Sequence, residues 1–452
     1  MSGASPSSSV PIESVAQLAA RLESGAKPRE AWRIGTEHEK IGFYTADHTP
    51  LDYQGGILPL LKGLQRFGWE PVREHATLIG LRRDGASISL EPGGQFELSG
   101  APVEHLHQTC AEMNRHLREV REVAGEVGAA FLNLGFRPVT RLDDVPVMPK
   151  GRYGIMKRYM PTVGTLGHEM MFRTCTVQTN LDFSSESDMV KKMRVSLALQ
   201  PVATALFANS PFKDGTLNGF RSYRSEIWKD VDRARSGMLP FVWEAGFGFE
   251  AYVEYALDVP MYFVHRDGTY HDVAGGSFRD FMDGRLAGFE GEVPTLSDFD
   301  DHLSTIFPEV RLKTFLEMRG ADTGPWREIC ALPAFWVGLL YDDAALDAAW
   351  DMVRGWTPDE LQGMRDAVPA QGLQTPFRDT TVQALAREAL SIARHGLNAR
   401  ARLNLHGENE TVFLQTLDAM ASSGQSNADV LIGLYKGAWE GDIGRVYTKC
   451  VY

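Results

Sequence analysis

A pair of carboxylates inside a predicted strand is the feature that most restricts how this chain can fold. The segment RIGTEHEKIGF, residues 33–43, places Glu37 and Glu39 two positions apart among isoleucine, glycine and phenylalanine residues. Successive side chains of a strand point to opposite faces of the sheet. We therefore expect Glu37 and Glu39 to share one face. His38 would lie on the other face, where a hydrogen-bonded structural histidine is a simpler interpretation than a metal ligand.

Three further segments show a similar division into two faces. Residues 310–322 read as one long strand with an apolar face and a charged face, whose members are Arg311, Lys313, Glu317 and Arg319. Residues 174–184 read as a strand whose polar face carries Thr174, Thr176, Gln178, Asn180 and Asp182. Residues 86–100 read as a hairpin of two short strands around Pro92-Gly93-Gly94, and they add Glu91 and Glu97.

These polar faces favour a nucleotide site when they are taken together. A solvated sheet face gives the same alternation, and for one strand alone that is the simpler interpretation. Carboxylates gathered on adjacent strands repel one another unless a cation lies among them. Mg²⁺ takes oxygen ligands and bridges carboxylates to phosphates, while Arg and Lys side chains bind phosphate oxygens. The sequence contains no GxxxxGK[ST] and no GxGxxG pattern, so ATP would bind without a P-loop or a Rossmann turn.

A basic stretch over residues 218–241 has two interpretations. It contains Arg221, Arg224, Lys229, Arg233 and Arg235. These side chains could form a wall that clamps carboxylates or phosphates, or they could cover a solvated helix face beside neighbouring acids. The spacing does not separate the two.

Bulk properties exclude several classes of protein. The net charge of −13 over 452 residues argues against a nucleic-acid partner. The longest apolar stretch, 330–341, is too short to span a bilayer, so no membrane partner is expected. Four cysteines without regular spacing argue against a zinc ribbon and a disulfide framework, and a cytoplasmic location follows. Cys110 falls on the apolar stripe of a helix predicted over 103–127, as a core thiol would.

The order of predicted elements indicates an α+β fold around one mostly antiparallel sheet. Strands at 33–45, 131–139, 174–184 and 310–322 alternate with helices at 14–24, 57–69, 103–127 and 187–210. The chain is predicted to be helical from about 330 to 452, and Thr357 with Pro358 and Glu360 has the pattern of a helix start. Residues 1–13 lack the features of a targeting peptide and are predicted to be a disordered tail before a single domain, 14–452.

Several motifs resemble those of the glutamate–cysteine ligases of plants and many proteobacteria. They span almost the whole chain in order: IGTEHEKIGF, EPGGQFELSGAP, RYGIMKRYMP, MMFRTCTVQTNLDFSSE, GFGFEAYVEYALDVPMYF, LEMRGAD and ALPAFWVGLLY. The resemblance implies a glutamine-synthetase/guanido-kinase-like cup, formed by an antiparallel sheet with helices behind it. It also implies that ATP, L-glutamate and L-cysteine give γ-glutamylcysteine, the first step of glutathione biosynthesis. The oligomeric state, monomer or homodimer, is left open.

The resemblance and the strand faces together assign roles to single residues. The predicted Mg²⁺ ligands are Glu37, Glu39, Glu91, Glu97 and Glu317. The predicted ATP-binding residues are Arg311, Lys313, Arg319 and Arg235, and the predicted catalytic residues are Arg319, Arg221 and Lys313. The predicted amino-acid pocket contains Thr174, Thr176, Gln178, Arg221, Arg224, Tyr262 and Trp326. The alternatives are an Mg²⁺-dependent phosphohydrolase or nuclease, another carboxylate–amine ligase, and a non-catalytic small-molecule binder.

Overall fold

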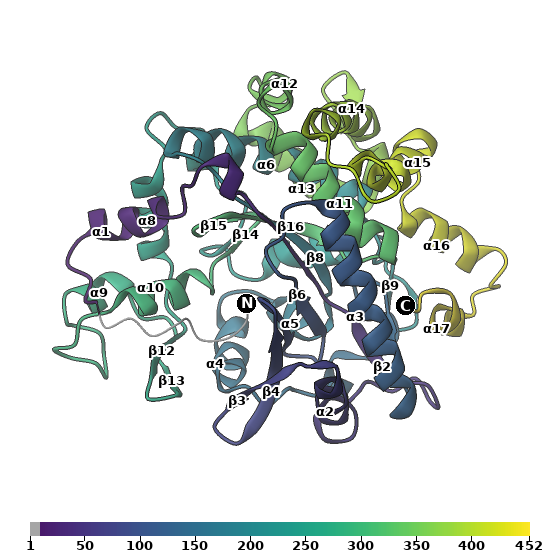
Figure 1. Ribbon diagram of the computed structural model, residues 1–452. Helices are drawn as coiled ribbons and strands as arrows, with labels where there is room; N and C mark the ends of the chain where they lie inside the picture. The colour runs from purple at the N-terminus through teal and green to yellow at the C-terminus, as the bar shows by residue number, and fades with distance from the viewer. Residues whose placement is uncertain (1–9) are drawn as a thin grey trace.

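An eight-stranded antiparallel sheet forms the centre of the molecule (Figure 1). The computed structural model describes residues 10–452. The strands lie in the order β15-β16-β8-β1-β6-β5-β4-β3, and every neighbouring pair is antiparallel. Their bounds are β1 Ile34–His38, β3 Glu70–Glu74, β4 Thr77–Arg83, β5 Ala86–Leu90, β6 Phe96–Ser99, β8 Thr176–Leu181, β15 Val310–Leu312 and β16 Leu316–Asp322. The prediction of an α+β fold around an antiparallel sheet is confirmed.

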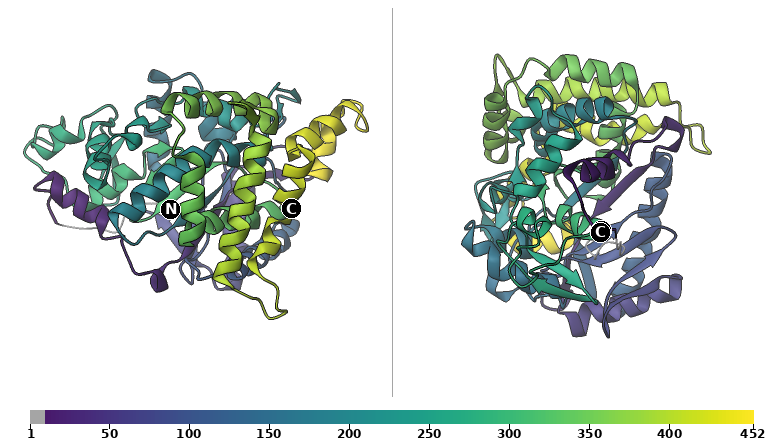
Figure 2. Two further views of the ribbon diagram at one scale, coloured as in Figure 1. Left: turned by 90° about the horizontal axis from the view of Figure 1, so that it is seen from above. Right: turned by 90° about the vertical axis from the view of Figure 1, so that its left-hand side faces the viewer.

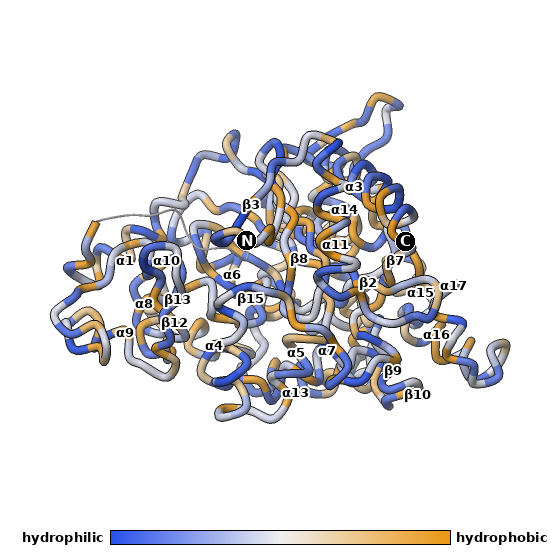
Figure 3. The backbone as a smooth tube through the Cα atoms, turned by 90° about the horizontal axis from the view of Figure 1, so that it is seen from below, coloured by the Kyte–Doolittle hydropathy of each residue, from blue (hydrophilic) through white to orange (hydrophobic). Residues whose placement is uncertain are grey.

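Three long helices cover one face of this sheet. They are α3 Leu106–Glu126, α6 Glu186–Leu206 and α11 Trp326–Leu340. Helix α11 packs against β8 and β1, α6 packs against β16 and β15, and α14 Val382–Arg400 packs behind α11. Figure 2 shows these helices as a layer on one side of the strands. In Figure 3, hydrophilic and hydrophobic residues alternate along α3 and α14, as expected for helices that bury one side.

The remaining elements surround this two-layer centre. The other helices are α1 Val15–Glu23, α2 Leu58–Leu64, α4 Gly151–Tyr159, α5 Gly167–Arg173, α7 Tyr223–Ile227, α8 Phe249–Asp258, α9 Phe278–Met282, α10 Leu296–Leu303, α12 Asp343–Val353, α13 Pro358–Gln371, α15 Gln415–Ser423, α16 Asn427–Lys436 and α17 Val446–Lys449. Two further antiparallel pairs are β2 Ile41–Tyr44 with β7 Ala129–Leu132, which are far apart in sequence, and the hairpin of β12 Phe263–Arg266 with β13 Thr269–Asp272. Two-residue strands are β9 Phe212–Lys213, β10 Thr216–Leu217, β11 Ser236–Gly237, β14 Phe307–Pro308, β17 Pro376–Phe377 and β18 Thr380–Thr381.

Two of the long predicted strands are each divided in two. The predicted strand 33–45 breaks after His38, because β2 leaves the large sheet to pair with β7. The predicted strand 310–322 turns back at Lys313, whose N–H donates to the Phe315 carbonyl (2.8 Å), so β15 and β16 form a hairpin. A run of alternating residues does not reveal such a turn, because no glycine or proline marks it.

Other boundaries also differ from the prediction. The helix predicted from 103 begins at Leu106, where His105 accepts a hydrogen bond from the Gln108 N–H. Strands β3 and β4 and helices α4 and α5 were not predicted, and β7 ends at Leu132. The predicted start of α13 is confirmed, since Thr357 accepts from the Glu360 N–H (3.3 Å) and Pro358 is the first helical residue.

The cysteines correct one prediction. Cys110 of α3 and Cys330 of α11 form a disulfide, with a sequence separation of 220 and 5.8 Å between their Cα atoms. Cys110 is therefore no core thiol, whereas Cys175 and Cys450 are free and buried. Only a tertiary contact could reveal this pairing, because neither residue lies in a recognisable cysteine motif.

The predicted tail and the apolar stretch can be compared with the structure only in part. Residues 1–9 of the predicted disordered tail lie outside the described residues. Residue Ile12 is buried and donates its N–H to the Pro294 carbonyl (2.8 Å), so this end of the tail is bound to the protein. Within 10–452, no single helix is long and apolar enough to cross a membrane. Helices α11 and α12 reach the necessary length and apolar character only when taken together, and the chain bends by 90° between them. The single domain 14–452 stays a prediction.

The apolar face of β15 provides a stability test. Leu312 is fully buried beneath the helical layer, whereas Leu405 is fully exposed. We expect Leu312→Ala to lower the free energy of unfolding by about 2–5 kcal/mol, because it leaves a cavity. Leu405→Ala should change it by less than about 0.5 kcal/mol. Urea denaturation measures both, and equal losses would contradict the burial of Leu312.

Candidate active site

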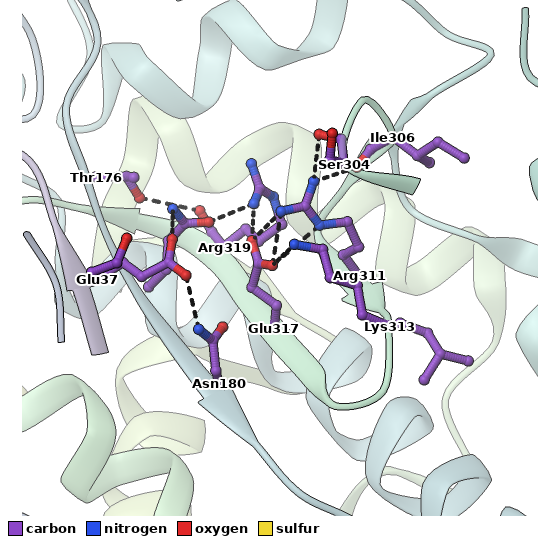
Figure 4. A network of polar contacts seen from close by, with 12 residues as sticks. Glu37, Thr176, Asn180, Ser304, Ile306, Arg311, Lys313, Glu317 and Arg319 are labelled. Carbon is purple, nitrogen blue, oxygen red and sulfur yellow. Dashed lines mark hydrogen bonds and ion pairs between the residues drawn. The ribbon is translucent and has the colours of Figure 1, made fainter. Parts of the chain in front are cut away.

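The sheet face opposite the helical layer carries a continuous set of polar contacts, which we call the polar ladder (Figure 4). Glu37 of β1 accepts hydrogen bonds from Asn180 Nδ2 (2.9 Å) and Gln178 Nε2 (3.4 Å) of β8. Gln178 Oε1 in turn accepts from Arg319 Nη1 (2.6 Å) of β16, and Arg319 pairs with Glu317. The strand register causes this, since Glu37 lies opposite Gln178 and Glu317 lies opposite Asn180.

Glu317 is the most enclosed charge of the ladder. Its side chain is 0% exposed and contacts Arg311 Nη2 (2.8 Å), Lys313 Nζ (3.5 Å) and Arg319. The β15–β16 hairpin brings these together, because Arg311 lies directly across from Glu317. Burial alone raises the pKa of Glu317, but the charges of Arg311, Arg319 and Lys313 outweigh burial and hold that pKa well below its usual range. Glu317 is therefore ionised at neutral pH.

A second acidic group lies where β1 ends. Glu39 Oε2 accepts the Thr176 N–H (3.0 Å), and the Glu39 N–H donates to the Thr176 carbonyl (3.0 Å). Burial raises the pKa of Glu39 well above its usual value, and the charges of Glu91 and Glu97 raise it further. Burial and Glu91 also raise the pKa of Glu97, which accepts a hydrogen bond from Ser99 Oγ (2.5 Å). These carboxylates destabilise one another's charge.

The five predicted Mg²⁺ ligands therefore separate into two groups. Glu37 and Glu317 belong to the ladder, where amides and basic side chains already contact them. Glu39, Glu91 and Glu97 form the acidic group, in which burial and the charge of Glu91 raise the pKa values of Glu39 and Glu97. Oxygen donors of this kind fit Mg²⁺ in their chemistry. Within residues 10–452, however, no three His, Cys, Asp or Glu side chains are arranged to hold a metal ion. Mg²⁺ ligation stays a prediction.

The basic stretch divides between the site and the scaffold. Arg221 pairs with Asp429 Oδ1 of α16 (2.9 Å) and donates to the Ala370 carbonyl of α13, so it joins surrounding helices instead of lining the polar ladder. Arg235 is fully buried; it pairs with Asp232 (2.6 Å) and covers the Tyr262 ring at 3.9 Å. Both residues thus have contacts within the scaffold, and their roles at the substrates stay predictions.

Arg224 remains beside the ladder. Its Nη2 donates to the Arg319 carbonyl (2.9 Å), and Arg224 lines a narrow pocket with Trp228, Glu309 and Arg319. Burial lowers the pKa of Arg224, although the charges of Asp322, Glu39 and Glu309 oppose that effect. Its Nε is buried without a hydrogen-bond partner among the described residues. A buried guanidinium with an unused donor is suited to an anionic group.

The predicted amino-acid pocket contains two kinds of residue. The hydroxyls of Thr174 and Thr176 donate to backbone carbonyls of Met170 (2.6 Å) and Ala321 (2.8 Å), so both support the strands. In contrast, Tyr262 Oη and Trp326 Nε1 are buried and have no hydrogen-bond partner within residues 10–452. Because buried polar atoms normally have a partner, these two are the better candidates for contact with a bound molecule.

His38 and Lys150 show what the sequence revealed and what it did not. His38 lies on the helix side as predicted, and its ring meets His116 of α3 at 5.6 Å. Lys150, just before α4, was not predicted; its Nζ donates to the Leu90 carbonyl (2.8 Å) beside Glu91 and Glu97. Burial lowers the pKa of Lys150 to about 8. Its position next to the RYGIMKRYMP motif was the only signal for it.

Comparison with known proteins identifies the family. The profile of glutamate-cysteine ligase family 2 matches residues 33–449. The chloroplastic glutamate–cysteine ligase B of rice, Oryza sativa subsp. japonica, is 57% identical over 436 residues, which are 96% of this chain and 86% of that protein. The chain belongs to this family. The chloroplastic glutamate–cysteine ligase of Arabidopsis thaliana is 55% identical over 96% of this chain and 82% of its own length.

Two further conclusions follow for this member of the glutamate–cysteine ligase family. A crystal structure of the Francisella tularensis glutamate–cysteine ligase with AMP has a TM-score of 0.55 and 13% identity, over 92% of this chain and 88% of that chain. That likeness shows a common fold. The predicted cytoplasmic location is contradicted, because the rice and Arabidopsis thaliana relatives are named as chloroplastic enzymes.

The buried charges predict a contrast between two neutralising substitutions. Glu317→Gln should lower the free energy of unfolding by about 3–5 kcal/mol, because it leaves Arg311, Arg319 and Lys313 without their shared carboxylate. Glu37→Gln should cost about 1 kcal/mol, since an amide oxygen can still accept from Asn180. Urea denaturation of both variants checks this, and a Glu317→Gln protein as stable as Glu37→Gln would contradict it.

Glu328 of α11 predicts a pH dependence. Burial raises its pKa to about 8, although a hydrogen bond from Asn427 opposes that shift. Between about pH 4.3, the value for an unfolded chain, and about pH 8, the folded state therefore holds one proton more, and stability falls as pH rises. Glu328→Gln should remove up to about 1.4 kcal/mol per pH unit from that slope. Thermal unfolding of the wild type and of Glu328→Gln between pH 5 and pH 8 measures this. If the two proteins lose stability in parallel as pH rises, Glu328 is ionised in the folded state and the prediction is wrong.

Proposed function

We propose that the chain is a glutamate–cysteine ligase, which forms γ-glutamylcysteine, ADP and phosphate from L-glutamate, L-cysteine and ATP. The observation that carries the proposal is the polar ladder, where Glu37, Gln178, Arg319 and Glu317 alternate acceptor and donor groups across three strands. Membership of the family, over residues 33–449, supports the reaction, and we propose this face as its site. The phosphohydrolase alternative is not favoured, because it has no support from the relatives.

The reaction needs positioning and charge neutralisation more than a protein nucleophile. An oxygen of the glutamate γ-carboxylate attacks the γ-phosphorus of ATP, the bond to the β-phosphate oxygen breaks, and ADP leaves. The cysteine amine then attacks the acyl carbon of γ-glutamyl phosphate, phosphate leaves, and the amine loses a proton. Arg319 and Lys313, which already share Glu317, are placed to bind phosphate oxygens. Closure of the site during the reaction would keep water from the acyl phosphate.

The acidic group would hold Mg²⁺ when the nucleotide binds. Glu39, Glu91 and Glu97 are the residues that would bind it, because their mutual repulsion is relieved by a cation. The bound ion would neutralise charge on the ATP phosphates. Glu37 and Glu317 stay candidates for Mg²⁺ ligands, but each already has polar contacts within the ladder.

The amino-acid substrates would use buried donors that have no partner among the described residues. Arg224 Nε, Tyr262 Oη and Trp326 Nε1 are buried groups without a partner among the described residues. A guanidinium matches a carboxylate, and a phenol or an indole N–H can donate to a second carboxylate oxygen. We propose these three side chains as the contacts of the amino-acid substrates, in preference to Arg221.

An assay of ADP release tests the proposal. ADP should form only when L-glutamate and L-cysteine are both present with ATP, and mass spectrometry should identify γ-glutamylcysteine. Glu37→Gln should reduce turnover by at least about 10²-fold while the protein stays folded, because a preorganised charge is lost from the ladder. ADP release without any amino acid, or product formation from a different amino-acid pair only, would overturn the assignment.

A further inference from the structure

Tyr452 lies where the ends of three site strands meet. Its phenol donates to the Gly324 carbonyl (2.8 Å) and lies 3.3 Å from Thr323 Oγ1. Thr323 and Gly324 follow directly after β16, the strand that carries Glu317 and Arg319. The phenol therefore contacts the turn that leads from the polar ladder into α11.

The segment around Tyr452 is itself held in place by backbone contacts. The Tyr452 N–H donates to the Phe131 carbonyl (3.1 Å), and the neighbouring Val451 forms a bridge with Leu132 of β7. The Asn133 N–H donates to the Cys450 carbonyl (2.9 Å). These contacts extend β7 and give the phenol a fixed origin from which to reach the site.

Thr323 connects this phenol to Glu39. The Thr323 hydroxyl donates to the Glu39 carbonyl (3.1 Å), and the Thr323 N–H donates to the Cys175 carbonyl (3.2 Å) just before β8. The Glu39 N–H donates to the Thr176 carbonyl (3.0 Å). One small set of hydrogen bonds thus joins the end of β16, the start of β8 and the end of β1.

We infer that Tyr452 is a positioning residue, which acts through Gly324 and Thr323 on the backbone carbonyl of Glu39 and thereby on the position of the Glu39 carboxylate. The inference rests on the proposed function, in which Glu39 belongs to the acidic group that binds the divalent cation. Packing alone would need only the ring, which meets His38 edge-on at 6.5 Å. The hydroxyl adds a donor for the Gly324 carbonyl and so fixes the turn beside Glu39.

The hydroxyl can be tested apart from the ring. Tyr452→Phe keeps the ring and removes the donor, and Thr323→Val removes the next hydroxyl, whereas Thr323→Ser retains it. Tyr447→Phe is the matched control, because Tyr447 lies in the same C-terminal region but stacks on His48 at 4.0 Å. All variants are made in the full chain, and their thermal midpoints are compared with the wild type.

Two readouts are measured on each variant. The first is binding of Mn²⁺, without substrates or ATP, from the free-ion signal in electron paramagnetic resonance. The second is kcat with the KM for each substrate. We expect Tyr452→Phe to weaken Mn²⁺ binding and to lower kcat by about 3- to 10-fold each, the range of one hydrogen bond. Thr323→Ser and Tyr447→Phe should stay within about twofold of the wild type.

A double-mutant cycle identifies the path of the effect. If Tyr452 acts through Thr323, Tyr452→Phe and Thr323→Val together should be no worse than about the stronger single variant. Additive effects would overturn the inference. So would a loss of thermal stability in Tyr452→Phe with Mn²⁺ binding and kcat unchanged. If the wild type makes no γ-glutamylcysteine, the proposed function fails, and the Mn²⁺ readout still decides the role of Tyr452.

Discussion

The burial of the Glu317 carboxylate among Arg311, Lys313 and Arg319 is the constraint on which the site depends. A carboxylate that is 0% exposed is stable only if cations and donors surround it. That requirement holds the β15–β16 hairpin closed, since Arg311 reaches Glu317 only from across the turn. It also holds Arg319 toward Gln178, and through Gln178 it reaches Glu37 on β1. Four strands, β15, β16, β8 and β1, are thereby connected by polar side chains as well as by backbone hydrogen bonds.

The two faces of the sheet have separate tasks. The helix side is mostly apolar, apart from residues such as His38, and α3, α6 and α11 bury it, with a disulfide between α3 and α11. That layer makes the strands rigid enough for the opposite face to carry charges at fixed distances. The acidic group at the end of β1 differs from the ladder, because burial and the charges of Glu91 and Glu97 destabilise the ionised form of Glu39. A site with one neutralised group and one acidic group is suited to receive a nucleotide together with a cation.

The polar faces could be predicted from the period of two, and most of the ladder followed from it. Gln178, Glu317 and Arg319 lie on one face as predicted, and Leu312, Leu316 and Met318 lie buried on the other. The period of two did not predict where the long strands end, because the chain turns at Glu39-Lys40 and at Lys313 without a glycine or proline. The roles predicted for Arg221 and Arg235 stay predictions, and both residues also form internal ion pairs that the sequence did not indicate. A basic residue near a site reads the same in sequence whether it binds a substrate or an internal carboxylate.

The antiparallel strands, their apolar and polar faces, the helical C-terminal third and the family could all be predicted from the amino-acid sequence. Each of these depends on local alternation, on helical spacing or on motifs that are continuous in the chain. Only the tertiary structure decided which charges meet. It paired Cys110 with Cys330, divided the five glutamates into two groups, and brought Tyr452 to the turn after β16. The physical reason is that these contacts depend on strand order and on turns, which join residues far apart in sequence.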